Sequence, residues 1–316
     1  MHDRSKRWAL AALGGLLVTP VFGGPLRDAL VDRVLSRRIE SAQESGEFGE
    51  GKSEPLTLPS YVKAQLDVSY GADPAQRLDV YMPTARSGNA PMPVIFMVHG
   101  GAWMIGDKST ANVVMNKITR WIPKGYVVVC PNYRMLPKTD VQGEVDDVAK
   151  ALAYAQAHAA DWGGDSNRFV LMGHSAGAHL VSLIAAAPEL ALNQGARSWL
   201  GTVSLDSASM DVVRTMREKH YSFYDKVFGS DQGFWQQVSP YSRLRKAPAP
   251  MMLVCSSKRE DSCPQARSFA DKVNSLGGRA TVLPVDLTHA DVNKKLGESS
   301  AYTDAVEGFL RSIGLN

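Results

Sequence analysis

The sequence has no strong excess of charge of either sign, and it contains few cysteines. Its 35 basic and 32 acidic residues leave a net charge of +3, with no basic block of the kind that binds nucleic acid. Three cysteines do not make a disulfide scaffold. No H-E-x-x-H sequence and no paired C-x-x-C motif is present, so we expect no metal and no cofactor. The 316 residues, 44% of them hydrophobic, can bury the core of one large α/β domain or of one and a half smaller ones.

The N-terminal residues 1–24 have the pattern of a secretory signal peptide. Basic residues within positions 4–7 precede the uncharged run 8–22, and Gly23 and Gly24 follow. The alternative is an uncleaved anchor, because no A-x-A cleavage site is present. A membrane span needs about 20 strongly apolar residues, however, and Pro20 and two adjacent glycines interrupt this run. We therefore expect an exported protein, periplasmic or secreted, which contacts a membrane only if this segment stays uncleaved.

Residues 25–55 are expected to form an amphipathic helix followed by a linker. Apolar residues recur at helical spacing between positions 26 and 35, and this helix either packs on the body of the protein or uses its arginines at a membrane. The linker sequence GEFGEGKS, at 46–53, matches a phosphate-binding loop letter by letter. Such a loop needs a strand before it and a helix after it. Here a helix precedes it and Pro55 follows, so we reject nucleotide binding.

From residue 62 onward the pattern alternates between strands and helices. The expected strands are 62–70, 77–82, 92–98, 126–130, 168–172, 201–205, 251–255 and 281–285. The expected helices include 109–124, 141–160 and 264–276, with another after residue 177. Near-continuous apolar strands such as 92–98 are typical of strands buried on both faces. This alternation predicts a mostly parallel sheet with helices on both faces.

The pentapeptide Gly173-His174-Ser175-Ala176-Gly177 joins an expected strand to an expected helix. A serine hydroxyl becomes a nucleophile only when a base can reach it, so the serine must project from a sharp turn. Glycines at both ends allow the strand and the helix to approach closely. G-x-S-x-G also occurs by chance, and the alternative is an ordinary glycine-rich turn.

The strand at 92–98 ends in His-Gly-Gly-Ala-Trp, at 99–103. Glycines after a buried strand let the backbone turn its N–H groups toward a developing negative charge. The alternative is a plain loop with a buried tryptophan. Either way, this motif follows one buried strand and the serine motif follows another.

Four motifs in this order resemble the α/β-hydrolase superfamily. They are HGGAW at 99–103, GDK at 106–108, NYR at 132–134 and GHSAG at 173–177. The chain is most similar to the carboxylesterase branch related to hormone-sensitive lipase and to arylformamidase-like esterases. The resemblance extends over about residues 62–310.

The resemblance implies an α/β-hydrolase fold over residues 56–316, with about eight strands. The segment at about 207–247, rich in aromatic residues, would be a small cap insertion that helps to form the substrate pocket. The family's oxyanion hole implies the N–H groups of Gly101, Ala102 and Ala176.

A Ser…Asp…His order along the chain is typical of this fold. Ser175 is the expected nucleophile, and His289, in the loop beyond the last expected strand, is the expected base. In the family the acid lies on the turn after the strand 251–255, which indicates Asp261, with Glu260 as the alternative on the same turn. Asp206, at the end of the strand 201–205, is an outside candidate.

The remaining expectations concern the pocket and the cysteines. Trp103, His174 and Tyr224 are the expected pocket residues. Cys255 and Cys263 bracket the turn that carries the expected acid, and they form either a disulfide or two reduced thiols.

The sequence therefore predicts a serine esterase that cleaves small-molecule esters of short acyl chains through an acyl-enzyme on Ser175. One alternative is an N-formyl or aryl amide hydrolase of the arylformamidase-like kind. The other, from a different class, is a non-catalytic binding protein with this fold. Neither the oligomeric state nor the physiological substrate follows from the residues.

Overall fold

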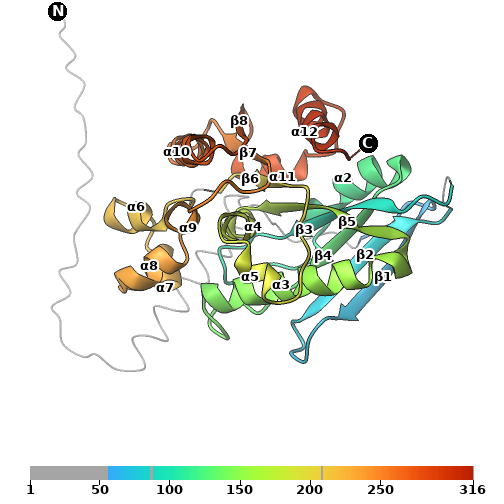
Figure 1. The fold of residues 1–316 in the computed structure, drawn as a ribbon, viewed down its shortest axis with the longest axis horizontal. Helices are drawn as coiled ribbons and strands as arrows, with labels where there is room; N and C mark the ends of the chain where they lie inside the picture. Colours follow the sequence, from blue (N-terminus) through green and yellow to red (C-terminus); the bar gives the residue numbers. More distant parts are fainter. Residues whose placement is uncertain (1–55, 86–87, 208, 316) are drawn as a thin grey trace, which may run out of the picture. The chain divides into compact units, whose positions relative to one another are not determined.

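The computed structural model describes residues 56–85, 88–207 and 209–315. These residues form one eight-stranded sheet in the order β1-β2-β4-β3-β5-β6-β7-β8, with helices packed against it (Figure 1). The predicted signal peptide, amphipathic helix and linker, including the sequence GEFGEGKS, lie outside the described residues. Within the described ranges, no helix is both long enough and apolar enough to span a membrane.

Five of the seven strand pairings in the sheet are parallel. The other two pairings, β1 with β2 and β2 with β4, are antiparallel. The prediction of a mostly parallel sheet of about eight strands is confirmed. The strands are β1 (Val62–Ser69), β2 (Arg77–Pro83), β3 (Met92–Val98), β4 (Val127–Pro131), β5 (Gly164–His174), β6 (Gly201–Leu205), β7 (Met251–Ser256) and β8 (Ala280–Val285).

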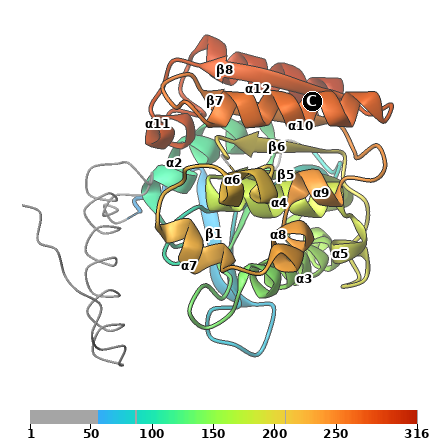
Figure 2. The same ribbon diagram turned by 90° about the vertical axis from the view of Figure 1, so that its left-hand side faces the viewer.

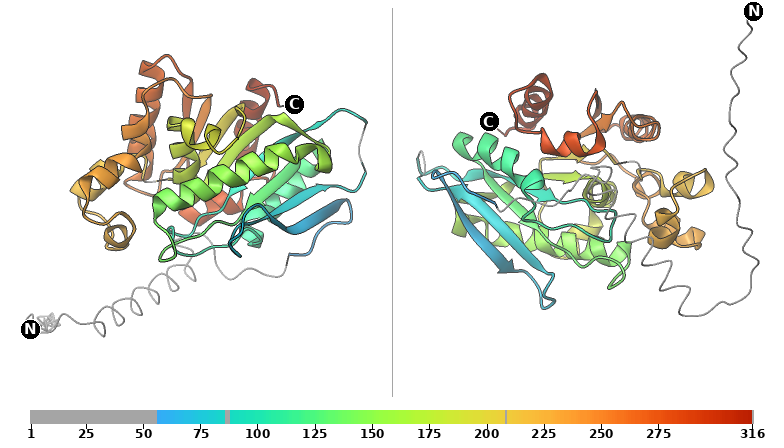
Figure 3. Two further views of the ribbon diagram at one scale, coloured as in Figure 1. Left: turned by 60° about the horizontal axis from the view of Figure 1, so that its bottom comes forward. Right: turned by 180° about the vertical axis from the view of Figure 1, so that it is seen from behind.

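Helices cover the two faces of the sheet, as the two views in Figure 3 show. The longer helices are α2 (Ala111–Trp121), α3 (Val141–Ala157), α4 (Ala176–Ala186), α10 (Ser262–Ser275) and α12 (Ala301–Ser312). The short ones outside the cap are η1 (Ile122–Lys124), η2 (Ala159–Trp162), α5 (Glu189–Leu192) and α11 (His289–Lys294). Helices α2, α11 and α12 share one hydrophobic core with the sheet, while α3 and α4 pack together against β5 and α10 lies along β7 and β8.

Helix α4 is the most enclosed of these helices. Every one of its residues is buried, and a helix that is apolar all round is stable only inside a protein. Because α4 begins directly after β5, the end of that strand is fixed between the sheet and the other helices.

The sheet reverses its strand order beside β3. The chain moves from β3 outward to β4 and then returns across β3 to β5. In open α/β sheets a crevice forms outside the carboxyl ends of the strands at such a switch point. The HGGAW loop after β3 and the GHSAG turn after β5 both lie at this edge.

The segment expected to form a cap insertion contains four short helices between β6 and β7. They are α6 (Val212–Arg217), α7 (Phe223–Phe228), α8 (Gln232–Gln237) and α9 (Pro240–Arg243). Figure 2 views the molecule from the side of these helices, which face the viewer in front of the sheet. Helix α9 packs against α4, so the insertion is attached close to the serine turn.

Candidate active site

Ser175 lies on a sharp turn between β5 and α4. Its φ is 55°, a left-handed conformation that costs free energy for any residue with a Cβ atom. Its N–H donates to the carbonyl oxygen of Leu205, 3.0 Å away. A Cβ atom at Gly173 would lie 2.3 Å from the carbonyl oxygen of Gly177, and one at Gly177 would lie 2.3 Å from that of Val98. The glycines of G-x-S-x-G are therefore required by close backbone approach, as predicted.

His289 meets the serine from a segment 114 residues further along the chain. Its Nε2 lies 2.9 Å from Oγ of Ser175, so the structure brings together the expected nucleophile and the expected base. His289 is the first residue of α11, which Thr288 caps by accepting the N–H of Asp291 at 3.2 Å. The imidazole is nearly buried, with 9% of His289 exposed.

The carboxylate on the other side of His289 belongs to Asp206. Its Oδ2 lies 2.5 Å from Nδ1 of His289, and its Oδ1 accepts from the N–H of Ser256 at 2.7 Å and from the hydroxyl of Ser262 at 2.5 Å. The side chain is fully buried. Asp206 has a φ of 57°, and directly follows β6. The carboxylate thus joins the end of β7, at Ser256, to His289.

The expectation that Asp261 contacts His289 is wrong. Asp261 precedes α10, and its Oδ2 lies 3.4 Å from Nη2 of Arg259, with 40% of the side chain exposed. Its neighbour Glu260, the alternative, is exposed. Because β6 and β7 are adjacent and parallel, their ends lie at the same edge of the sheet, and either could have supplied an acid. The signal for Asp206 in the sequence was its position directly after a buried strand.

Arg259 is a residue near this site that the sequence reasoning missed. It lies on the turn after β7, and its Nη1 is 3.1 Å from Oδ2 of Asp206. A charged residue on a turn is normally solvent-exposed, so no pattern in the sequence indicated that it faces inward.

The charges of these groups follow from their surroundings. Burial alone would raise the pKa of Asp206, but hydrogen bonding and charge interaction with His289, and then the Arg259 guanidinium, bring that pKa far below its usual range. The pKa of His289 is lowered, chiefly by burial, although Asp206 opposes the shift. At neutral pH the site therefore contains an ionised carboxylate and a neutral imidazole.

The HGGAW loop after β3 adopts an unusual backbone conformation. Gly101, Ala102 and Trp103 have φ values of 119°, 52° and 60°, and the carbonyl oxygen of Gly101 accepts the N–H groups of Met104 and Ile105. Across the described part of the chain, no backbone hydrogen bond from the N–H of Gly101 or Ala102 is found. The N–H of Ala176, in the first turn of α4, has no partner within its helix. Gly101 and Ala102 lie in the loop after β3, and Ala176 begins the helix after β5, so all three are at the switch point.

His174, expected to be a pocket residue, contacts His289 through its side chain. It is fully buried, and its Nε2 donates to the carbonyl oxygen of His289 at 3.0 Å. Burial lowers its pKa well below the usual range, so the ring is neutral. His174 ends β5, and this hydrogen bond ties β5 to the first residue of α11, which fixes the backbone of His289.

Trp103 and Tyr224 come together in an aromatic cluster with the cap. The Trp103 ring centre lies 6.0 Å from that of Tyr224 and 5.2 Å from that of Phe228. Its indole N–H donates to Nδ1 of His179 at 3.3 Å. Trp103 directly follows Ala102, so this cluster adjoins the loop that carries the expected oxyanion donors.

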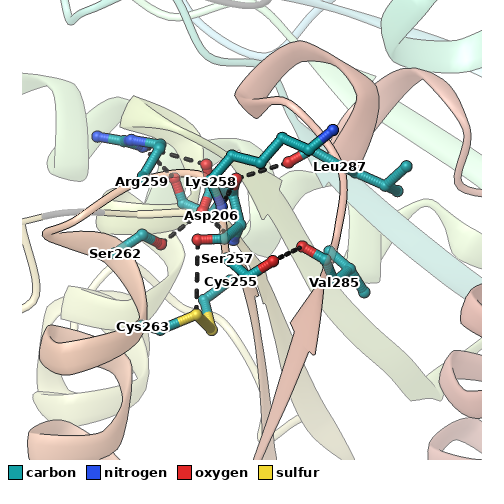
Figure 4. The surroundings of a disulfide bond; sticks show 10 residues. Asp206, Cys255, Ser257, Lys258, Arg259, Ser262, Cys263, Val285 and Leu287 are labelled. Atoms are coloured by element: carbon teal, nitrogen blue, oxygen red, sulfur yellow. Dashed lines mark hydrogen bonds and ion pairs between the residues drawn. A yellow bond between two sulfur atoms is a disulfide. The ribbon is translucent and has the colours of Figure 1, made fainter.

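Cys255 and Cys263 form a disulfide, which settles the alternative that the sequence left open. The bond closes the turn between β7 and α10, beside Asp206 (Figure 4). Cys130 is free and buried.

The BD-FAE family model matches residues 78–270 of this chain. Among curated proteins, the chain is 28% identical over 254 residues to isoprenylcysteine alpha-carbonyl methylesterase ICME of Arabidopsis thaliana, with 73% of this chain and 57% of that protein covered. It is 27% identical over 317 residues to esterase LipQ of Mycobacterium tuberculosis, with 92% and 72% covered. For the Arabidopsis protein named probable isoprenylcysteine alpha-carbonyl methylesterase ICMEL1, 36% identity extends over 115 residues, which are only 23% of that protein.

Solved structures share the fold over most of this chain. Esterase B from Lactobacillus rhamnosis matches with a TM-score of 0.68 at 22% identity, covering 91% of this chain and 95% of that one. Esterase Est2 from Thermogutta terrifontis matches with a TM-score of 0.67 at 20% identity, covering 85% and 98%. The α/β-hydrolase fold is thus shared with esterases of known structure.

Proposed function

This chain belongs to the BD-FAE family, and we propose that it is a serine hydrolase that cleaves carboxylic esters of short acyl chains. The observation that carries the proposal is the row of contacts from Ser175 through His289 to Asp206, at 2.9 and 2.5 Å. A hydroxyl, an imidazole and a carboxylate in this arrangement make a serine nucleophilic.

In the proposed reaction, Nε2 of His289 takes the hydroxyl proton as Ser175 attacks the ester carbonyl carbon. Asp206 holds the imidazole through Nδ1 and stabilises the cation that forms. His289 then returns the proton to the leaving alcohol, and an acyl-enzyme remains on Ser175. Water, deprotonated by the same imidazole, attacks the acyl group; the bond to Oγ of Ser175 breaks, the imidazolium returns the proton to Oγ, and the acid is released.

We propose that the N–H groups of Gly101, Ala102 and Ala176 form the oxyanion hole. Two features support this assignment: the positive φ values of Gly101 and Ala102, and the position of Ala176 at the first turn of α4, where N–H groups are left without helical partners. Donors held in advance by a rigid backbone stabilise a developing oxyanion without reorganising.

The preference for short acyl chains is supported by the aromatic cluster. Trp103, Tyr224 and Phe228 fill the space beside the HGGAW loop with rings whose centres lie 5.2 to 6.0 Å apart. We propose that this wall limits the length of the acyl chain. The names of the relatives, esterases and methylesterases, favour esters over the N-formyl amides of the alternative reading.

Hydrolysis rates on p-nitrophenyl acetate, butyrate and decanoate, and on N-formylkynurenine, test the proposal. We expect the first two to be hydrolysed fastest, and Ser175→Ala to lower the rate by several orders of magnitude. Trp103→Ala is expected to improve the rate on decanoate relative to acetate. Faster turnover of N-formylkynurenine would favour the amide alternative, and Ser175-independent turnover would refute the mechanism.

We also propose that the protein is exported. The support is the signal-like pattern of residues 1–24 together with the Cys255–Cys263 disulfide, since disulfides persist mainly outside the reducing cytosol. Sequencing the N-terminus of the protein recovered from the expressing cells and their medium tests both export and cleavage.

A further inference from the structure

The turn that was expected to carry the acid instead directs an arginine toward it. Nη1 of Arg259 lies 3.1 Å from Oδ2 of Asp206 and 3.3 Å from its backbone oxygen. Nη2 lies 3.4 Å from Oδ2 of Asp261. Only 23% of the arginine side chain is exposed, and Asp206 is completely enclosed. The guanidinium is therefore held between two carboxylates with little solvent around it.

The same guanidinium borders the imidazole. Nη1 of Arg259 lies 3.0 Å from Nδ1 of His289. Nδ1 donates its proton to Oδ2 of Asp206, and a guanidinium has only donors, so these two nitrogens cannot hydrogen-bond to each other. They share Oδ2 as acceptor. A positive charge thus lies beside the edge of His289 that faces the acid.

The turn is anchored on Asp206 at both of its ends. Ser256 and Ser262 both donate to Oδ1 of Asp206. Ser256 directly follows Cys255, and Ser262 directly precedes Cys263, the two cysteines of the disulfide. Figure 4 shows Arg259, Ser262 and the disulfide around Asp206. The segment closed by the disulfide consequently surrounds the Asp206 carboxylate. Ser256 and Ser262, at its two ends, donate to Oδ1, and Arg259, in its middle, donates to Oδ2.

We propose that Arg259 is a positioning residue of this site, which fixes the Asp206 carboxylate against His289 and opposes the build-up of positive charge on the imidazole. The proposal rests on the proposed function of Ser175, His289 and Asp206. A charge-assisted hydrogen bond to Oδ2 restricts rotation of the carboxylate and keeps it ionised. The cost is that the imidazolium formed during the reaction lies next to a cation.

The other charged or titratable groups around His289 come from several elements. They are Asp206 after β6, Asp261 and Tyr224 beside Arg259, His174 at the end of β5, Tyr302 on α12 and Lys117 on α2. The two aspartates raise the pKa of His289, whereas burial and Arg259 lower it. Removing the guanidinium takes away one of the two influences that lower this pKa, so the imidazole should protonate at higher pH.

Arg259→Met tests this inference, with Lys258→Met as the matched control. Lys258 is the neighbouring cation on the same turn, but its side chain is 50% exposed and pairs with Asp286 at 3.6 Å. For Arg259→Met we expect the acidic limb of the pH profile of kcat/KM, measured on p-nitrophenyl butyrate, to shift to higher pH by about one unit. We expect kcat to fall about tenfold with KM little changed, because a positioning loss affects the transition state.

Arg259→Lys separates charge from geometry. A lysine ammonium restores the positive charge but not the rigid fork of donors, so the acidic limb should return toward the wild-type position while kcat recovers only in part. For Lys258→Met we expect neither change. An unmoved limb with wild-type kcat in Arg259→Met, or an equal shift in Lys258→Met, would overturn the proposal.

A second measurement does not depend on turnover. In full-length protein carrying Ser175→Ala, the pKa of His289 is measured by NMR titration of its ring, with and without Arg259→Met. We expect the pKa to rise when Arg259 is removed and to stay in place for Lys258→Met. An unchanged pKa after removal of Arg259 would refute its role even if esterase activity is found. A rise in the pKa of a protein without esterase activity would instead count against the proposed function alone.

Discussion

Asp206 and His289 are 83 residues apart in the chain, yet Oδ2 of the first lies 2.5 Å from Nδ1 of the second. The acid comes from the end of β6, the strand next to the one that carries Ser175. Ser256 at the end of β7, Arg259 on the turn that follows and Ser262 at the start of α10 all donate to that acid. The carboxylate is thus at the centre of the site's hydrogen bonds.

Asp206→Asn should lower kcat on p-nitrophenyl butyrate by about 10³- to 10⁴-fold, because an amide cannot hold His289 in the required tautomer. Asp261→Asn is the matched control on the turn after β7, and its rate should stay within a few fold of wild type. Kinetics of both variants at pH 7.5 provide the measurement. A large loss in Asp261→Asn with a small one in Asp206→Asn would reverse the assignment of the acid.

The pH dependence of kcat/KM should reflect the neutral form of His289. Hydrolysis requires the unprotonated imidazole, and burial lowers the pKa of His289 from its ordinary value of 6.5. The group is protonated only below that lowered pKa, so activity should persist below pH 6.5 and fall at more acidic pH. A profile on p-nitrophenyl butyrate from pH 4.5 to 8.5 gives the midpoint. A midpoint above 6.5 would contradict the account.

Reduction of the Cys255–Cys263 disulfide should destabilise the protein. The bond closes a loop across a sequence separation of 8 residues, which in the chain-entropy model corresponds to about 2.5 kcal/mol and to a fall in Tm of about 5 °C. Calorimetry with and without reductant measures the change. Cys255→Ser/Cys263→Ser should have the lower Tm already and should not respond to reductant. Equal sensitivity of the double variant would show that the effect comes from elsewhere.

Glu144→Gln should raise the stability of the protein at alkaline pH. Glu144 is fully buried, and neither oxygen of its carboxyl group has a hydrogen-bond partner in the described part of the chain. Burial raises its pKa well above 4.5. As the pH rises above 4.5, the unfolded chain releases this proton and the folded one retains it, so stability is lost.

The gain in Tm from Glu144→Gln should therefore be larger at pH 8 than at pH 5. Glu260→Gln, at an exposed glutamate, should leave Tm nearly unchanged at both values. Calorimetric scans of the two variants and the wild type provide the comparison. A gain for Glu144→Gln that is independent of pH would mean that the buried carboxyl group is not the cause.

Much of the fold follows from local patterns. The strands β3 and β6 begin and end at the bounds predicted for them, 92–98 and 201–205. For β3 the reason is that a continuous apolar segment of this length is stable only when both faces of the strand are buried. The turn at Ser175 was predictable because it depends on residues close in sequence, the glycines two positions away on either side.

The acid was harder to predict because it depends on contacts between distant segments. Asp206 and Asp261 both follow parallel strands, and the two are distinguished by the backbone turn at Asp206, with φ 57°, and by donors from Ser256 and Ser262. Neither feature has a local sequence pattern. Arg259 escaped notice because a single charged residue on a turn is normally solvated.

Reaction with a fluorophosphonate tests the central claim most directly, since this reagent phosphonylates only an activated serine. The full-length protein is treated, digested and analysed by mass spectrometry. The account predicts stoichiometric modification of Ser175, with a much slower reaction in Asp206→Asn and none at that position in Ser175→Ala. A folded wild-type protein that remains unmodified, or one that carries the label on another residue, would contradict it.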